Sequence, residues 1–112
     1  MIDLNKEATR AHFNATKRGL PLDNRSIDKH LQKEVIEMIS ADKIRNPLSL
    51  HDIANTREDV PFLFNYANEM KDSLTDELAD IIIICLTKAK VNRIDIDRAV
   101  MIKQRVNELR KD

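Results

Sequence analysis

Apolar side chains recur along the chain in steps of three and four residues, a spacing that places them on one face of an α-helix. The clearest run contains the apolar residues Ile27, Leu31, Val35, Met38 and Ile39. The pattern predicts four long helices over about 5–17, 27–41, 73–91 and 96–110. Together they indicate an all-α protein built as a helical bundle.

Capping residues and helix breakers mark the expected ends of these helices. Gly19 follows the first helix at the position where a left-handed residue commonly ends one. Ser26 is the expected N-cap of the second helix, because its hydroxyl can accept from a first-turn N–H group. Ser73 or Asp76 caps the third helix, and Asp95 caps the fourth.

The connection between the second and third helices has the weakest pattern. Residues 41–60 show no sustained periodicity, although 49–54 are compatible with a short helix. Asn46-Pro47 ends the region of the second helix, since the residue before a proline avoids helical geometry. Pro61 suits the first turn of a further short helix.

The third helix contains the longest apolar run of the chain, from Ile81 to Leu86. The residues before and after it continue the helix without a break, which excludes an isolated buried strand. A helix that is apolar nearly all round needs cover on several sides. A small single chain provides that poorly, so the bundle is expected to be completed by oligomerisation.

The composition supports a single helical domain over residues 1–112. One glycine and a low aromatic content, with 34% charged residues, fit helices with solvated faces better than a β-sandwich. The single cysteine, Cys85, lies in the apolar run and is expected to be a small buried side chain. With only one cysteine, the chain cannot form an internal disulfide.

The charge and the absence of long apolar segments restrict the expected partners. The formal net charge is zero, so no basic excess indicates a nucleic acid polymer as partner. The longest apolar run is far below the roughly 20 residues needed to span a bilayer, and the first residues lack an apolar signal core. We therefore expect a cytoplasmic protein that does not associate with a membrane.

Two pairs of acidic residues lie on the second and third predicted helices. Glu34 and Glu37 form one pair, and Glu77 and Asp80 form the other, each with a spacing of three that places both carboxylates on the same side of a helix. Both pairs adjoin apolar positions, where clustered negative charge is costly unless a cation neutralises it. Mg²⁺ prefers such oxygen ligands. The alternative is that these short patterns mark solvated helix faces.

The sequence around the two pairs resembles the MazG-like family of all-α nucleotide pyrophosphohydrolases. Residues 30–38, HLQKEVIEM, are similar to the family's L-x-x-E-x-x-E helix, and residues 76–83, DELADIII, are similar to its E-E-L-A-D helix. Residues 93–100, RIDIDRAV, resemble the entry of its last helix, and residues 103–110 resemble its K-x-x-x-N-x-x-R ending. The resemblance covers about residues 17–41 and 71–110.

Two features depart from the family pattern. Lys33 stands where many members have another glutamate, which places a positive charge beside the acidic pairs. The 39 residues between Glu37 and Glu77 exceed the usual connection, so residues 42–72 are interpreted as an insertion. Its aromatic residues, Phe62, Phe64 and Tyr66, are candidates for stacking on a base, with packing inside the inserted helix as the stronger alternative.

The resemblance implies a function for these residues. It implies Mg²⁺-dependent hydrolysis of a nucleoside triphosphate, ribose or deoxyribose, to the monophosphate and pyrophosphate. The oligomer expected from the apolar third helix is a homodimer or a homotetramer. The implied metal ligands, for Mg²⁺ or Mn²⁺, are Glu34, Glu37, Glu77 and Asp80. Glu37 is also the candidate general base. The candidate phosphate-binding residues are Lys33, Lys103, Asn107 and Arg110. The alternative is a non-catalytic helical module of the same fold that binds a nucleotide or another protein.

Overall fold

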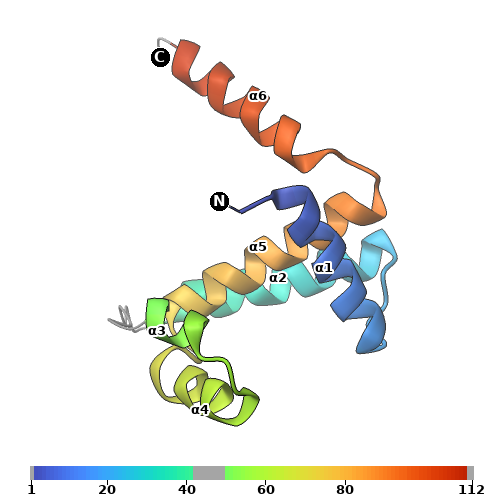
Figure 1. Ribbon diagram of the computed structural model, residues 1–112. Helices are drawn as coiled ribbons and strands as arrows, with labels where there is room; N and C mark the ends of the chain where they lie inside the picture. Colours follow the sequence, from blue (N-terminus) through green and yellow to red (C-terminus); the bar gives the residue numbers. More distant parts are fainter. Residues whose placement is uncertain (1, 42–49, 111–112) are drawn as a thin grey trace. The chain divides into compact units, whose positions relative to one another are not determined.

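The computed structural model describes residues 2–41 and 50–110, and all regular structure among them is α-helical (Figure 1). In chain order the helices are α1 (Leu4–Lys17), α2 (Asn24–Ser40), α3 (Leu50–Asn55), α4 (Asp59–Glu69), α5 (Leu74–Val91) and α6 (Ile96–Leu109). The all-α class predicted from the sequence is therefore confirmed. None of these helices combines the length and apolar character needed to cross a membrane.

The helix ends follow from local hydrogen bonds. The predicted caps of α5 and α6 are confirmed: Ser73 Oγ accepts from the backbone N–H of Asp76 at 3.2 Å, and Asp95 Oδ1 accepts from that of Arg98 at 3.2 Å. The prediction for α2 was wrong. Asp23, rather than Ser26, caps this helix, because its Oδ2 accepts from the backbone N–H of Ser26 at 3.1 Å. The helix consequently begins earlier than expected. The predicted stop at Asn46-Pro47 lies outside the described residues.

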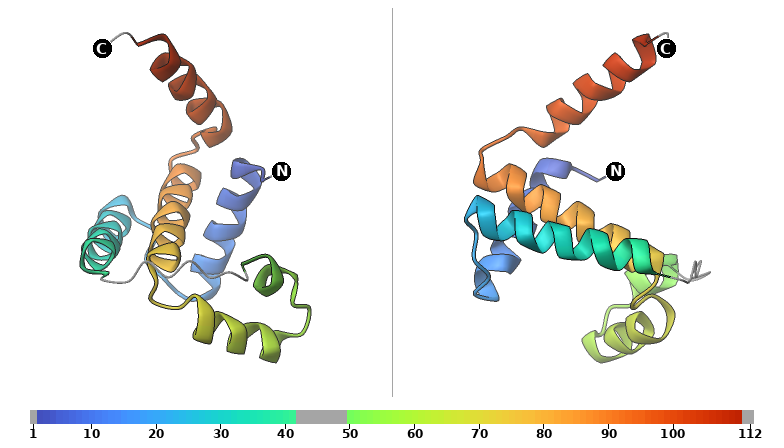
Figure 2. Two further views of the ribbon diagram at one scale, coloured as in Figure 1. Left: turned by 90° about the vertical axis from the view of Figure 1, so that its left-hand side faces the viewer. Right: turned by 180° about the vertical axis from the view of Figure 1, so that it is seen from behind.

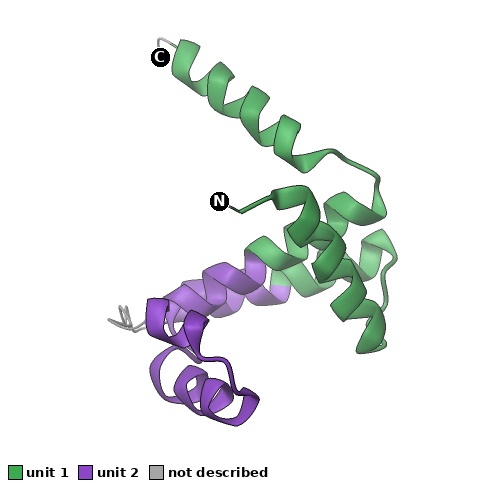
Figure 3. Cartoon of the chain, viewed as in Figure 1, with its two compact units in different colours: residues 1–32, 82–112 green, residues 33–81 purple. Residues whose placement is uncertain are grey.

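The chain divides into two compact units (Figure 3). Unit 1 contains residues 1–32 and 82–112, and unit 2 contains residues 33–81. The boundaries fall within α2 and α5, so each unit holds half of each of these helices. The organisation of residues 1–112 as one domain stays a prediction.

Small residues on α1 form the centre of unit 1. Ala8 and Ala11 pack with Leu86 of α5, and Leu4 and Ile96 lie against this cluster. The small side chains of Ala8 and Ala11 leave room for the larger Leu86 side chain to pack against α1. In Figure 2, α1 accordingly runs past the carboxyl-terminal half of α5. The amino-terminal half of α2 joins the same unit through an ion pair between Asp28 and Lys88.

The amino termini of α1 and α6 cap each other. The backbone N–H groups of Leu4 and Asn5 donate to the two carboxylate oxygens of Asp97, each at 3.0 Å. In return, Asn5 Oδ1 accepts from the backbone N–H of Ile96 at 2.9 Å, while Asn5 Nδ2 donates to Asp95. These bonds satisfy first-turn donors of both helices. They attach the beginning of α6 to unit 1.

Replacing Asn5 with alanine is expected to lower the free energy of unfolding by about 1–2 kcal/mol. The substitution removes the acceptor of Ile96 N–H and the donor to Asp95 together. Urea unfolding followed by circular dichroism measures the change. Asn14→Ala, an exposed position on the same helix, is the matched control. An equal loss in both variants would contradict the reciprocal cap.

Beyond its first turn, α6 is fully exposed. Every residue from Arg98 to Leu109 is exposed, including Val100 at 39% and Val106 at 42%. The sequence predicted a buried stripe at Ile96, Val100, Val106 and Leu109. In the single chain this is wrong except for Ile96, which is half-buried. The apolar spacing predicted the helix correctly, but the cover it requires does not come from the described residues of this chain.

Unit 2 is organised around the loop between α4 and α5. The Tyr66 hydroxyl lies 3.0 and 2.9 Å from the two carboxylate oxygens of Asp76, and Asp76 Oδ2 also accepts from the backbone N–H of Asp72 at 3.0 Å. Tyr66 therefore holds the start of α5. The other aromatic residues of α4 are more open: Phe62 is 37% and Phe64 67% exposed. Phe62 is therefore mostly covered and Phe64 mostly open, so the choice between packing inside the segment and stacking on a base stays a prediction.

Candidate metal centre

Three of the four predicted acidic ligands come together in unit 2. Glu34 projects from α2, and Glu77 and Asp80 project from α5. One carboxylate oxygen of each residue lies within 4.8 Å of one such oxygen of the other two. The spacing of three between Glu77 and Asp80 places them on one side of α5. The arrangement thus assembles three oxygen donors from two helices that are distant in the sequence.

Glu77 is the most informative residue of this group. It is only 7% exposed, and its Oε2 atom is buried without a hydrogen-bond partner among the described residues. A buried carboxylate oxygen in that condition is costly, because it has lost water and gained no donor. A cation at this position would supply the missing interaction.

Asp76, the residue before Glu77, is a buried carboxylate of unit 2 whose hydrogen-bond partners lie within the protein. Asp76 is also 7% exposed, but its oxygens accept from the Tyr66 hydroxyl and from the Asp72 backbone. Burial alone therefore does not distinguish a ligand from a structural residue. The difference is that the oxygens of Asp76 accept hydrogen bonds within unit 2, whereas Glu77 Oε2 has no partner in the part of the chain that the structure describes.

Burial and like charge act together on two of the acids. Burial raises the pKa of Glu34, and the nearby Glu37 and Asp80 carboxylates raise it further. Burial also raises the pKa of Glu77, with additional increases from Glu34 and Glu37. Both shifts mean that the charged forms are disfavoured in the absence of a counter-charge. A divalent cation would reverse this preference.

The raised pKa values predict how the metal-free protein responds to pH. The contribution of Glu34 and Glu77 to stability is fully present below the ordinary glutamate pKa and is lost as pH rises through the raised folded-state values. We therefore expect Mg²⁺ to increase the melting temperature more at about pH 7.5 than at about pH 5, where protons compete with the metal. Thermal melts in Mg²⁺ and in EDTA at matched ionic strength measure this. A Mg²⁺ effect of equal size at both pH values would contradict it.

Glu37 has a different place from the other three acids. It is exposed, and none of its oxygens belongs to the group of mutually close atoms. Its charge nevertheless raises the pKa of both Glu34 and Glu77, so it lies beside the cluster. Lys33 is likewise exposed on α2. The roles of Glu37 and Lys33 stay predictions.

The remaining predicted site residues belong to unit 1. Lys103 and Asn107 are exposed on α6, and Arg110 is the C-cap of this helix. The acidic cluster belongs to unit 2. The contribution of these three residues to the acidic site therefore stays a prediction.

A second close group of carboxylates was missed from the sequence. Oxygens of Asp72, Asp76 and Glu77 also lie within 4.8 Å of one another. The sequence interpretation treated Asp76 only as a possible cap. The proximity depends on Asp72, which adopts a left-handed backbone (φ 63°) and turns the chain before α5. No spacing rule indicates such a turn at an aspartate. Because the Asp76 carboxylate already accepts a hydrogen bond from the Tyr66 hydroxyl, this group is a weaker metal candidate than the first.

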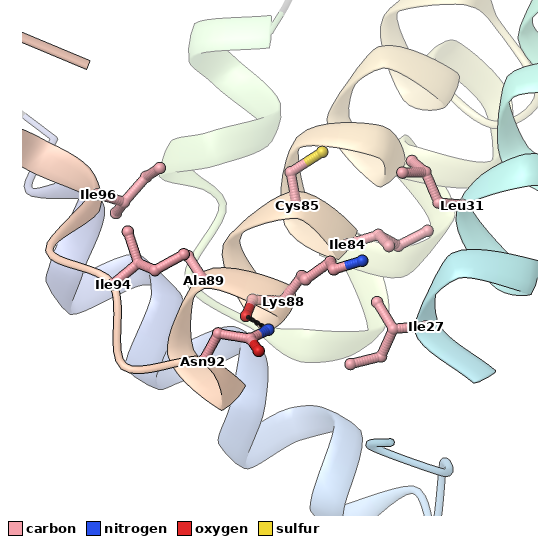
Figure 4. Close-up of a pocket in the computed structure, with 9 residues that line it drawn as sticks. All are labelled: Ile27, Leu31, Ile84, Cys85, Lys88, Ala89, Asn92, Ile94 and Ile96. Atoms are coloured by element: carbon pink, nitrogen blue, oxygen red, sulfur yellow. Dashed lines mark hydrogen bonds between the residues drawn. The ribbon is translucent and has the colours of Figure 1, made fainter. Parts of the chain in front are cut away.

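Unit 1 contains an apolar cavity of about 360 Å³ (Figure 4). Its lining comes from α2, α5, the segment between α5 and α6, and the first residue of α6, namely Ile27, Leu31, Ile84, Cys85, Lys88, Ala89, Asn92, Ile94 and Ile96. Cys85 is exposed, so the expectation of a buried cysteine was wrong. The Lys88 ammonium is held by Asp28. The cavity offers apolar surface but no cluster of reactive groups.

Comparison with known proteins adds no assignment. No family model and no curated protein matches the sequence, and no solved structure matches the fold.

Proposed function

We propose that the protein is a Mg²⁺-dependent nucleoside triphosphate pyrophosphohydrolase, which converts a ribo- or deoxyribonucleoside triphosphate and water into the monophosphate and pyrophosphate. The observation that carries the proposal is the buried Glu77 carboxylate in the cluster with Glu34 and Asp80, because its Oε2 finds no hydrogen-bond donor in residues 2–41 and 50–110. The substrate class rests on the resemblance of the two acidic helices to MazG-like enzymes.

The donor set fits a hard divalent cation. Glu34, Glu77 and Asp80 would hold Mg²⁺ or Mn²⁺, and three protein oxygens leave positions for water and phosphate oxygens. A metal held there would supply positive charge to offset the negative charge of the phosphate oxygens. Among the described residues, the cluster contains carboxylates and neither cysteine nor histidine, which disfavours zinc and softer metals.

The exposed residues around the cluster would act on water and phosphate. Glu37 is solvent-accessible and adjacent to the acids, so its carboxylate can orient the attacking water and accept its proton. Lys33 would donate to a phosphate oxygen from the same helix. Lys103 and Arg110 would add further donors, with Arg110 able to bind two phosphate oxygens at once. Asn107 would orient the substrate through its amide.

Product analysis across a panel of nucleoside triphosphates tests this function. We expect release of pyrophosphate and monophosphate in Mg²⁺ or Mn²⁺, and none in EDTA. Phosphorus NMR distinguishes these products from a nucleoside diphosphate and orthophosphate. The latter pair would indicate cleavage of the terminal anhydride bond instead. Absence of turnover with every nucleotide, in protein whose helical content is shown by circular dichroism, would contradict the enzymatic function.

A second candidate is a non-catalytic module of the same fold that binds a nucleotide or a protein. The exposed apolar side chains of α4, with Val60 at 78% and Leu63 at 59%, favour it because such surface commonly meets a partner. In that case no nucleotide of the panel would be hydrolysed, whether or not it binds. The two functions are thus separated by the same nucleotide panel.

A further inference from the structure

Tyr66 joins the end of α4 to the beginning of α5. Its backbone carbonyl accepts from the N–H groups of Met70 and Lys71, each at 2.9 Å, where α4 ends. Its hydroxyl donates to Asp76 Oδ2 at 2.9 Å, in the first turn of α5. Both α4 and the first turns of α5 belong to unit 2 (Figure 3). A single residue of the segment between the two acidic helices therefore contacts the helix that provides two of the acids.

The turn before α5 holds the Asp76 carboxylate from a second direction. Asp72 has a left-handed backbone, and its N–H group donates to Asp76 Oδ2 at 3.0 Å. Ser73 is 0% exposed, and its hydroxyl donates to the Met70 carbonyl and accepts from the Asp76 N–H group. Side-chain and backbone contacts together thus fix Asp76.

The position of Asp76 determines the direction of Glu77. Adjacent residues of a helix differ by about 100° around its axis, so contacts that fix the first turn at Asp76 also orient Glu77. Oxygens of these two carboxylates lie within 4.8 Å of each other, and like charges so close repel. The hydrogen bonds to Asp76 restrain the movement that would relieve this repulsion. Glu77 is thereby kept within reach of Glu34 and Asp80.

We propose that Tyr66 is a positioning residue of the metal centre. Its hydroxyl acts through Asp76 and holds Glu77 in the orientation that a cation shared with Glu34 and Asp80 requires. The role belongs to the hydroxyl rather than the ring, so it differs from stacking on a base. It rests on the proposed function, because it requires a cation at the acidic cluster. It gives α4 a part in metal binding.

Titration of Tyr66→Phe with Mn²⁺ measures the role of the hydroxyl. Phenylalanine keeps the ring but cannot donate to Asp76. We expect the Mn²⁺ dissociation constant, measured by electron paramagnetic resonance, to rise about 10-fold, while circular dichroism shows wild-type helical content. Phe64→Leu is the matched control, because Phe64 is on the same helix and 67% exposed. An unchanged or lower dissociation constant in Tyr66→Phe, or an equal rise in Phe64→Leu, would overturn the proposal.

A double-mutant cycle tests whether the hydroxyl acts through Asp76. Asp76→Ala removes the acceptor, so adding Tyr66→Phe should cause no further loss of Mn²⁺ affinity. Asp76→Asn keeps an acceptor oxygen, so Tyr66→Phe should again weaken binding in that background. Equal losses on adding Tyr66→Phe in the alanine and asparagine backgrounds would overturn a route through Asp76.

Hydrogen exchange provides a test that needs no substitution. Coupling between two sites is reciprocal, so a contact that favours the metal is itself stabilised by the metal. We expect saturating Mg²⁺ to slow exchange of the Met70 and Lys71 amides, which donate to the Tyr66 carbonyl, by up to about 10-fold. Unchanged exchange at these amides in protein that binds Mg²⁺ would overturn the positioning role and leave the metal centre intact. Wild-type protein that binds neither Mn²⁺ nor Mg²⁺ would overturn both.

Discussion

Replacement of Glu77 by glutamine is expected to reduce Mg²⁺-dependent pyrophosphate release by at least about 1000-fold. The amide keeps the size of the side chain but removes the charge of the most buried member of the acidic cluster. Steady-state assays over a range of Mg²⁺ concentrations measure the effect. The rise in melting temperature caused by Mg²⁺ should disappear in the same variant.

The same substitution should stabilise the metal-free protein at neutral pH. Burial and the Glu34 charge raise the pKa of Glu77, so its ionised form is unfavourable when no cation is present. The neutral amide avoids this cost. Glu58→Gln is the matched control, since Glu58 is exposed and makes no side-chain hydrogen bond to its helix. A Glu77→Gln protein with normal turnover, or an equal loss in Glu58→Gln, would contradict the assignment of the metal site.

Replacement of Glu37 by glutamine should separate catalysis from metal binding. We expect a loss of turnover of about 100- to 10,000-fold, as for removal of a general base. The Mg²⁺-induced increase in melting temperature should be largely retained, because no Glu37 oxygen belongs to the close group formed by Glu34, Glu77 and Asp80. Parallel assays of activity and thermal stability test both parts.

The outcome for Glu37 also decides between two roles for this residue, general base and metal ligand. Loss of both turnover and the Mg²⁺ effect would show that Glu37 is a metal ligand, as the sequence pattern first suggested. Unchanged turnover would exclude it as the base. Lys29→Gln, which removes an exposed charge on the same helix, controls for a general electrostatic effect of substitutions on α2.

The helices were predictable because their signals are local. Apolar spacing gave all four long helices, and Ser73 and Asp95 were identified as caps from residue type alone. The error at α2 has the same origin, since Asp23 and Ser26 are both good caps and only the backbone geometry selects between them. The exchange of hydrogen bonds between Asn5 and Asp97 joins residues that are far apart in the sequence, and no local rule indicates it.

The acidic cluster was predictable in part. Spacing placed Glu77 and Asp80 on one side of a helix, and the adjoining apolar residues indicated burial. The sequence did not show that Glu37 faces solvent while Glu34 turns inward, because two residues three positions apart differ by about 60° around the helix axis. The exposure of Val106 and Leu109 was not predictable for another reason. Apolar spacing indicates that one face of a helix is suited to burial, but it does not indicate which surface covers that face.

Direct titration with Mn²⁺ is the measurement that tests the central claim most directly. Electron paramagnetic resonance distinguishes free from bound Mn²⁺ and requires no knowledge of the substrate. Saturable binding to the wild-type protein, displaced by Mg²⁺ and lost in Glu77→Gln but not in Glu58→Gln, is the predicted result. Binding that does not saturate, or that is the same in Glu77→Gln and the wild type, would contradict a metal centre at Glu34, Glu77 and Asp80.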